Sequence, residues 1–487
     1  MTTKKQFPPI PWLWRDYERA AAWYSGDPKR LSKCGGDSKS FWKTNEEIKV
    51  HAPMAADIAA LSAGMIFATS PEIECKDEAT SERIQEIFKQ ASIYSVLLQA
   101  AEMASVYGGV FLKWTWSEKD KFPRLHAVPA DMGLVNSVGG QVGEIIFWNI
   151  MKQEDSHFWR LQETYKPDGH IYSKLFKGDA SDLGTEVALT SIAETKHIKP
   201  DVISGTDTML AFYVPNILPN RACPYLPFGR SDFDGLYGLF DALDEAYSAM
   251  QREIRNTKTT VIVPAEYLRR RESLFNDETP AWVYANESGV FTALDIDSDH
   301  ASSPITIVNP ELRAQSRIAV CDDLIRRILS FAGYAPQSAG LDVNGSAESG
   351  TALNVRERKS IRTTEIKKTN WWHAINDIVR TMLILDKKVF KSRVNPDAEF
   401  SVELPANNQP DIAQLAEIIE HLERAGAVSI ETKVDMLHPD WDEKQKEAEI
   451  AKIRIEKGME GPDPLDPDPR LGDNEGSDNN SAAGDAD

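Results

Sequence analysis

Two helix-patterned segments enclose a strand-rich insert between residues 230 and 353, and this order constrains the fold more than any other feature. In the first segment, apolar residues recur at steps of three and four, which predicts one buried helical face: Phe233, Leu236, Leu239, Phe240, Leu243, Tyr247, Met250 and Ile254. Ser231 or Asp232 is a suitable cap for its start. The second segment, residues 310–331, places Leu312, Ile318, Leu324, Ile325, Ile328 and Leu329 on a similar face.

The insert between these helices, residues 259–309, contains four short runs typical of strands: VIVP, AWVYA, GVFTAL and PITIVN. A loop rich in glycine and small residues follows the second helix, from Gly333 to Gly350. Beyond the loop, the spacing of apolar residues predicts one long helix from Ser349 to about Phe390. Its first half is basic and polar, and its second half is apolar.

The rest of the chain alternates between helical and strand patterns. Helices are predicted at 11–24, 53–67 and 81–106, the last one broken near Ser92. Strands follow at 124–128, 144–150, 157–164 and 170–176, with a hairpin turn at Lys166–Gly169. Toward the C-terminus we expect a strand at 399–404 and helices at 412–422, 429–436 and 441–456. These patterns predict an α+β, multi-domain fold.

Charge and hydropathy exclude two broad classes of protein. The formal net charge is −20, of which −8 comes from the tail after Lys457, and a tight DNA-binding protein is usually basic. No apolar run is long enough to span a bilayer, and the N-terminus lacks the apolar core of a signal peptide, so we expect synthesis in the cytosol. The Pro/Asp/Gly/Asn-rich tail should be disordered and dispensable for assembly.

No motif predicts catalysis, a cofactor or a metal site. The four cysteines form no CxxC pair, and no GxSxG, HExxH, GxGxxG or P-loop pattern occurs. Asp232-Phe233-Asp234-Gly235 lacks the ligand spacing of a calcium loop and fits helix capping better. Asp322 and Asp323 are better explained as ion-pair partners of Arg326 and Arg327. The basic run from Arg356 to Lys368 has two possible interpretations: its side chains contact phosphate groups, or they form a solvated helix face.

Three stretches carry a resemblance to a known family: LPFGRSDFDGLYGLFDALDEAYS, GYAPQSAGLDVNGSAESGTAL and AGAVSIETKVDMLHPDW. Together with the order of elements from Pro9 to Lys457, they resemble portal proteins of tailed bacteriophages, the head-to-tail connector family. The resemblance implies a portal-like subunit with long stem and wing helices, a small β-rich clip and an α-helical crown. The implied boundaries are wing 1–228 and 350–408, stem helices 229–257 and 311–333, clip 258–310, tunnel loop 334–349, crown 409–457 and acidic tail 458–487.

The same resemblance implies the function. A portal protein assembles in the host cytoplasm and forms a homo-oligomeric ring, usually a dodecamer, at one capsid vertex of the virion. The ring is the channel for genome packaging and ejection, so double-stranded DNA passes through it. It docks the large subunit of terminase and the head–tail adaptor, and it contacts the major capsid and scaffolding proteins. No enzymatic activity, cofactor or membrane contact is expected.

The resemblance also assigns candidate site residues. In the tunnel loop, the small polar residues suit weak, replaceable contacts with moving DNA: Ser338, Asn344, Ser346 and Ser349. Arg356 and Arg358 are candidate phosphate contacts just beyond the loop. Arg269, Arg270 and Arg271 form a basic edge of the clip that would contact its partners. The alternative for the loop is an ordinary surface connection.

Two other functions remain open from the sequence. The chain could be a cytosolic enzyme, for example a hydrolase, that lacks recognisable motifs, or a structural adaptor without a DNA channel. An enzyme would be a monomer or small oligomer, whereas a portal would be a large ring. Particle images would separate an adaptor from a portal, because only the portal has a central channel.

Overall fold

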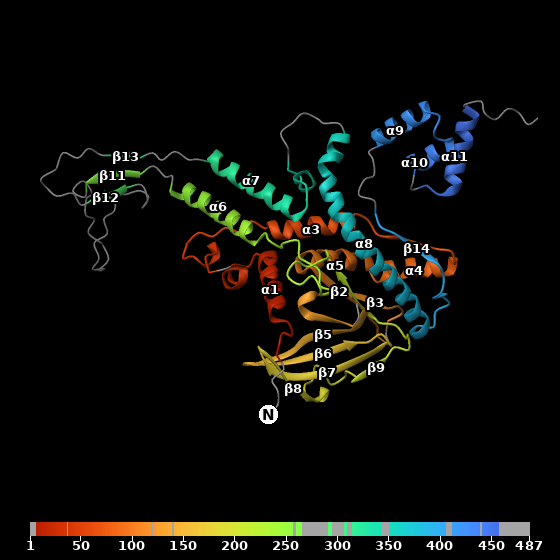
Figure 1. The fold of residues 1–487 in the computed structure, drawn as a ribbon, viewed down its shortest axis with the longest axis horizontal. Coiled ribbons are helices and arrows are strands. Elements are labelled where there is room, and N and C mark those ends of the chain that lie inside the picture. Colours follow the sequence, from red (N-terminus) through yellow and green to blue (C-terminus); the bar gives the residue numbers. More distant parts are fainter. Residues whose placement is uncertain are drawn as a thin grey trace, which may run out of the picture. The chain divides into compact units, whose positions relative to one another are not determined.

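The protein folds into two units, Met1–Asn407 and Asn408–Asp487, in a computed structural model (Figure 1). The structure describes residues 6–36, 38–117, 120–138, 141–256, 260–264, 291–294, 306–308, 314–341, 350–405, 412–438 and 441–456. Helices and several separate sheets alternate along the chain, which confirms the predicted α+β, multi-domain class.

The N-terminal part begins with helices. They are α1 (Pro11–Ser25), the short α2 (Pro28–Arg30), α3 (Met54–Ile66), α4 (Glu78–Gln90) and α5 (Ile93–Tyr107). Proline suits the first position of α1 because that position needs no backbone donor, and Gly26 ends the helix in the left-handed conformation. Ser92 lies between α4 and α5 with a φ of 52°, which confirms the predicted break.

Antiparallel strands follow these helices in two sheets. The smaller sheet has the order β10-β2-β3, formed by Ala211–Pro215, Gly109–Thr115 and Arg124–Pro129. The larger sheet has the order β4-β5-β6-β7-β8, with β9 paired to β7; its strands are Gly133–Val138, Gln141–Glu154, His157–Tyr165, His170–Asp179, Asp182–Val187 and Asp201–Ile203. The backbone N–H of Gly169 donates to the carbonyl of Lys166 at 3.1 Å, so the predicted hairpin turn is confirmed.

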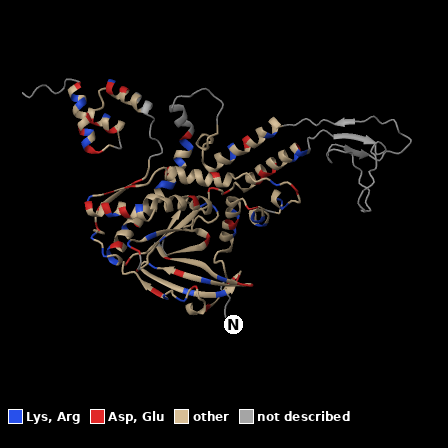
Figure 2. Ribbon diagram, turned by 180° about the vertical axis from the view of Figure 1, so that it is seen from behind, with Lys and Arg blue, Asp and Glu red and all other residues tan. Residues whose placement is uncertain are grey.

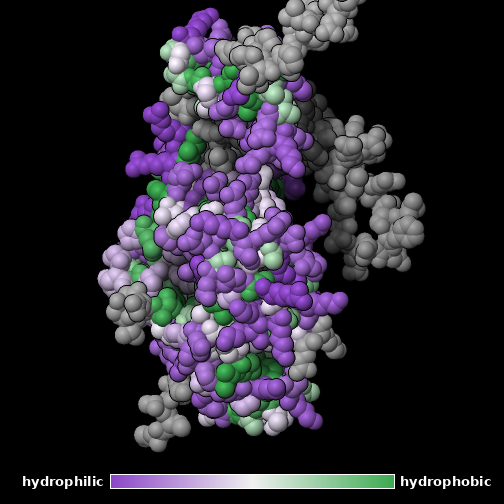
Figure 3. Space-filling view, turned by 90° about the vertical axis from the view of Figure 1, so that its right-hand side faces the viewer, coloured by the Kyte–Doolittle hydropathy of each residue, from purple (hydrophilic) through white to green (hydrophobic). Residues whose placement is uncertain are grey.

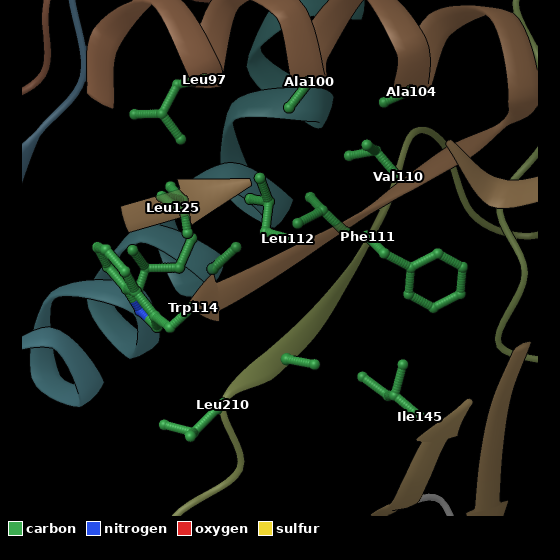
Figure 4. Packing of buried hydrophobic residues seen from close by; sticks show 14 of the residues in the cluster. Leu97, Ala100, Ala104, Val110, Phe111, Leu112, Trp114, Leu125, Ile145 and Leu210 are labelled. Carbon is green, nitrogen blue, oxygen red and sulfur yellow. The ribbon is translucent and has the colours of Figure 1, made fainter. Parts of the chain in front are cut away.

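Strand β2 is buried on both faces from Gly109 to Leu112, where its residues are apolar. On one side, Leu97, Ala100 and Ala104 of α5 cover Val110 and Leu112 (Figure 4). On the other side, Phe111 packs edge-on against Phe147 of β5, with ring centroids 5.3 Å apart. The main core therefore lies between the helical layer and the larger sheet.

The two helices predicted around the insert are α6 (Tyr237–Asn256) and α7 (Ala314–Ala332), which pack alongside one another (Figure 1). Between them, β11 (Thr260–Pro264) pairs in parallel with β12 (Phe291–Leu294) and antiparallel with β13 (Thr306–Val308). Strands therefore form in VIVP, GVFTAL and PITIVN as predicted, while AWVYA lies outside the described residues.

The structure corrects the predicted ends and faces of these helices. Residues 232–236 form turns, and helix α6 begins only at Tyr237. Ser231 and Asp232 are therefore too far from its start to cap it. Ile254 and Ile318 were expected on buried faces, yet both are exposed. The predicted ion pair between Asp323 and Arg327 is confirmed at 2.7 Å.

Helix α8 (Gly350–Val389) runs for 40 residues, close to the predicted length. Its second half buries Trp371, Ile375, Ile378 and Met382 in the main core. After α8, β14 (Phe400–Glu403) pairs antiparallel with β1 (Glu72–Cys75), which joins two segments more than 300 residues apart in the chain.

The second unit contains α9 (Ile412–Arg424), α10 (Ile430–Leu437) and α11 (Glu443–Glu456), so all three predicted helices are confirmed. Ser429 caps α10 by accepting a hydrogen bond from the backbone N–H of Thr432 at 3.2 Å. Val434 is buried in this unit, whereas Met436 and Leu437 are exposed. The acidic tail predicted to be disordered lies outside the described residues.

Candidate channel loop and its buried anchor

The first residues of the predicted tunnel loop, 334–349, pack against α8. Tyr334 is fully buried, and residues Pro336–Ala339 form a single 3-10 turn. Gly340 ends this turn with a φ of 74°, a conformation that glycine adopts without strain. Proline cannot adopt it, so a Gly340→Pro substitution would disrupt this turn.

Three side chains of α8 hold the docked segment in place. The Ser360 hydroxyl accepts hydrogen bonds from the backbone N–H of Ala335 at 2.7 Å and from the Ser338 hydroxyl at 2.9 Å. One turn later, Thr363 donates to the carbonyl of Gly333 at 2.8 Å. Lys359 donates to the carbonyl and to the hydroxyl of Ser330 at the end of α7. The passage from α7 into the loop is therefore fixed to α8.

A buried ion pair lies directly beneath this segment. Asp232, in the turn before α6, is 2.5 Å from the ammonium of Lys367 on α8. Lys367 also donates to the Tyr334 hydroxyl at 2.9 Å and to the Ser62 hydroxyl of α3 at 2.7 Å. All three of its N–H donors are therefore used, as a buried ammonium requires.

Asp232 gathers further donors from the N-terminal part. The Ser105 hydroxyl on α5 donates to Oδ2 at 2.6 Å, and the Asn216 amide after β10 donates to Oδ1 at 2.8 Å. We name the group Ser62, Ser105, Asn216, Asp232, Tyr334 and Lys367 the buried anchor. It connects the base of α6, the end of α7, helix α8 and the N-terminal part in one hydrogen-bonded network.

Burial and charge act in opposite directions on the ammonium of this network. Burial lowers the pKa of Lys367, whereas the adjacent Asp232 carboxylate raises it. Burial also raises the pKa of Tyr334 well above its ordinary value, and the Asp232 carboxylate raises it further. Tyr334 therefore stays neutral at physiological pH and can donate to Asp232, at 3.3 Å.

A second polar network binds α6 to residues 40–52. The Asp244 carboxylate, fully buried, accepts from the Trp42 indole at 2.9 Å and from the backbone N–H of Ala52 at 2.8 Å, and it lies 2.8 Å from Nδ1 of His51. One turn away on the same helix, Asp241 accepts from Ser40 and Phe41, both at 2.8 Å. Residues 40–52 are therefore bound to α6 through side chains at helical spacing.

The basic run of α8 divides into two parts. Arg358 and Arg362, one turn apart, are both exposed. Figure 2 marks the lysine and arginine positions along the helices in blue. Lys367 and Lys368 are buried, and Lys368 donates to the carbonyl of Pro405 at 2.6 Å. Only the first part is therefore available for an outside phosphate.

The structure describes few of the predicted site residues of the tunnel loop, the start of α8 and the clip. Ser338 lies in the docked turn, with its hydroxyl hydrogen-bonded to Ser360. Arg358 is exposed on α8. The remaining candidates lie outside the described side chains: Asn344, Ser346, Ser349, Arg356, Arg269, Arg270 and Arg271. Their proposed contacts stay predictions.

The sequence reasoning missed the buried anchor. It treated Asp232 as a helix cap and counted Lys367 in a basic run. The sequence does contain an indication of it. Ser360, Thr364, Lys367 and Trp371 follow one another at steps of four, three and four residues, so they lie on one face of the helix, and the apolar residues from Trp371 onward predict that this face is buried. A lysine in phase with a buried stripe indicates a buried carboxylate elsewhere in the chain.

Two kinds of feature are absent from the part of the chain that the structure describes: clusters of metal-binding side chains and helices that could span a membrane. No group of three or more histidine, cysteine or acidic side chains there could hold a metal ion. Among the same residues, no helix combines the length and the apolar character that crossing a bilayer requires. Hydrophilic side chains cover most of the face in Figure 3, and the apolar ones form small separate groups.

Comparison with known proteins gives the family. The model of the family described as "Phage portal protein, SPP1 Gp6-like" matches residues 15–463. The chain belongs to the phage portal protein family. No curated protein matches this portal protein. The match extends across both units, from α1 through α11, and includes the loop, the buried anchor and the insert between α6 and α7.

Chains from gene transfer agent (GTA) particles are among the solved structures that match this portal protein. A chain in the neck of an empty GTA particle, computed with C6 symmetry, is 12% identical with a TM-score of 0.42, covering 79% of this portal protein and 90% of that chain. A chain in the neck of a native GTA particle, computed with C12 symmetry, is 10% identical with a TM-score of 0.40, covering 87% and 93%. The family assignment rests on the sequence match.

Proposed function

We propose that this portal protein forms a ring of twelve copies at one capsid vertex of a virion and conducts double-stranded DNA during packaging and ejection. The observation that carries the proposal is the portal family match over residues 15–463. The paired helices α6 and α7 support it, because they are joined through a small sheet at one end and tied to α8 by the buried anchor at the other.

The elements suggest an assignment of portal regions. Residues 1–228 and 350–408 would form the wing, and 229–257 and 311–333 the stem, which contains α6 and α7. Residues 258–310, with β11, β12 and β13, would be the clip. Residues 409–457, with α9 to α11, would be the crown.

Residues 334–349 would be the tunnel loop of the channel. The docked turn at Pro336–Ala339 would fix the start of this loop. Ser338, Asn344, Ser346 and Ser349 would offer weak polar contacts. Arg358, together with Arg356, would supply sparse phosphate contacts near the entrance to the loop.

Partners follow from the same assignment. The clip, with Arg269, Arg270 and Arg271, would dock the large subunit of terminase during packaging and the head–tail adaptor afterwards. The wing would contact the major capsid and scaffolding proteins. The chain would have no enzymatic activity, so the purified protein should not hydrolyse ATP.

A packaging assay tests the proposal. Procapsids are assembled with and without the chain and are supplied with terminase, ATP and DNA. We expect DNase-protected DNA only in particles that contain the chain. Equal protection without it would overturn the proposed conduit, and so would ATP turnover by the purified chain alone. A variant that lacks residues 258–310 should still fold but lose terminase and adaptor binding.

A further inference from the structure

Strand β1 leaves one of its edges unpaired. It belongs to a two-stranded sheet with β14, and no other described strand joins that sheet. The backbone N–H of Lys76 donates to the carbonyl of Glu399, which continues the register of Glu74 with Ser401 and Glu72 with Glu403. Hydrogen-bonded pairs alternate with non-bonded pairs in an antiparallel ladder. The backbone groups of Ile73 and Cys75 therefore point away from β14, toward the open edge.

A groove of about 520 Å³ runs along this strand. Its lining includes every residue from Ser70 to Glu74, together with Ile84, Phe88 and Lys89 of α4 and Tyr94 of α5. Successive side chains of a strand point to opposite faces, so a groove that touches Glu72, Ile73 and Glu74 in succession follows the edge of the strand. The groove therefore offers backbone hydrogen-bonding groups next to an apolar floor.

The outer face of this small sheet carries like charges in direct opposition. Glu72 and Glu74 of β1 are exposed, and so is Glu403 of β14, which is the register partner of Glu72. Carboxylates directly opposite one another destabilise a sheet. A strand added beside β1 would place its own outward side chains next to Glu72 and Glu74, where basic residues would offset this repulsion.

We propose that β1 accepts an extended segment of a partner protein as a third strand, with basic and apolar residues in alternation. The apolar side chains of that segment would enter the groove above Ile84 and Phe88, and its lysine or arginine side chains would pair with Glu72 and Glu74. Hydrogen bonds to the backbone of Ile73 and Cys75 would set the register, as in other cases of strand addition.

The probe is a short fluorescein-labelled peptide of alternating lysine and valine, tested on the full-length chain by fluorescence anisotropy. A glutamate–valine peptide of the same length is the matched control. We expect the basic peptide to bind and the acidic one to fail. Hydrogen exchange should show new protection at the amides of Ile73 and Cys75 and little change at Glu72 and Glu74, whose amides already face β14.

The decisive variant is Glu72→Lys with Glu74→Lys. It should weaken peptide binding about tenfold or more, since 1.4 kcal/mol corresponds to a factor of ten. The melting temperature should stay level or rise, because the Glu72→Lys substitution places an ammonium group opposite Glu403. Glu194→Lys with Glu245→Lys makes the same change in net charge on exposed residues outside the groove and should leave binding unchanged.

Several results would overturn the inference. They are equal binding of the acidic peptide, unchanged binding by the Glu72/Glu74 variant, protection at another surface, or absence of binding because a second copy of the chain occupies the edge. None of these results bears on DNA packaging, so failure here would leave the proposed portal function standing.

Discussion

Helices α6 and α7 lie side by side, yet the two are held in different ways. On α6, the half-buried carboxylate of Asp241 and the fully buried carboxylate of Asp244 bind residues 40–52, so this segment of the same subunit covers part of the helix. On α7, Val320 and Phe331 are 52% and 69% exposed and lie on one helical stripe with the exposed Asp323–Arg327 pair. Within the described residues, nothing covers this stripe.

The difference indicates a division of roles between the paired helices. Helix α6 is fixed to its own subunit by directional polar bonds that leave little freedom of movement. Helix α7 keeps apolar surface that is more typical of an interface than of a solvated helix face. In a ring, this exposed stripe is the part of the helix pair that a neighbouring subunit would cover. Two variants test this contrast directly, and a third tests the buried anchor at the base of the helix pair.

The largest effect should come from Asp244→Ala on α6. The substitution leaves the Trp42 indole and the Ala52 amide without their acceptor, and it removes the partner of His51. We expect a loss of about 3–5 kcal/mol in the free energy of unfolding, typical of breaking a buried charged network. Urea denaturation and hydrogen exchange over residues 40–52 would measure it. The exposed neighbour supplies the control, since Glu245→Ala should change stability by less than about 0.5 kcal/mol.

A somewhat smaller effect is expected from Lys367→Met in the buried anchor. Asp232 would keep its bonds from Ser105 and Asn216 but lose its counter-charge, at a cost of roughly 2–4 kcal/mol. Adding Asp232→Asn should recover part of the loss, because no buried charge then remains unpaired. Lys387→Met, on an exposed position of the same helix, is the control. A double variant no more stable than Lys367→Met would contradict this account of the anchor.

The smallest effect on the isolated subunit should come from Val320→Ser with Phe331→Ser on α7. Both side chains are exposed, so the free energy of unfolding should change by less than about 0.5 kcal/mol. Assembly should weaken clearly, because burying each apolar side chain contributes about 1.5–3 kcal/mol. Ile328→Ser, on the buried face of α7, should instead destabilise the subunit. Normal ring formation by the Val320/Phe331 variant would remove this stripe from the interface.

Local patterns in the sequence predicted the local structure well. The break at Ser92, the turn at Lys166–Gly169 and the length of α8 all follow from residue spacing and from turn chemistry. Non-local contacts could not be predicted in this way. Nothing within β1 indicates that its partner is β14, because register between distant segments depends on the whole fold.

The candidate site was predicted only in outline. The glycine-rich segment marked a loop, but composition alone could not show that its first residues are docked on α8. Asp232 and Lys367 were missed because single charged residues resemble caps or solvated faces until the tertiary fold brings them 2.5 Å apart. The exposed Ile254 and Ile318 were misassigned for a related reason, since periodicity identifies an apolar face but not what covers it.

The most direct test of the portal account is to image the purified full-length chain by cryo-electron microscopy and to determine its mass under native conditions. The account predicts a closed ring of about twelve copies around an open central channel. The exposed stripe of α7 should lie at the contact between neighbouring subunits, and residues 334–349 should line the channel. A monomer or dimer, or a closed assembly without a channel, would contradict it.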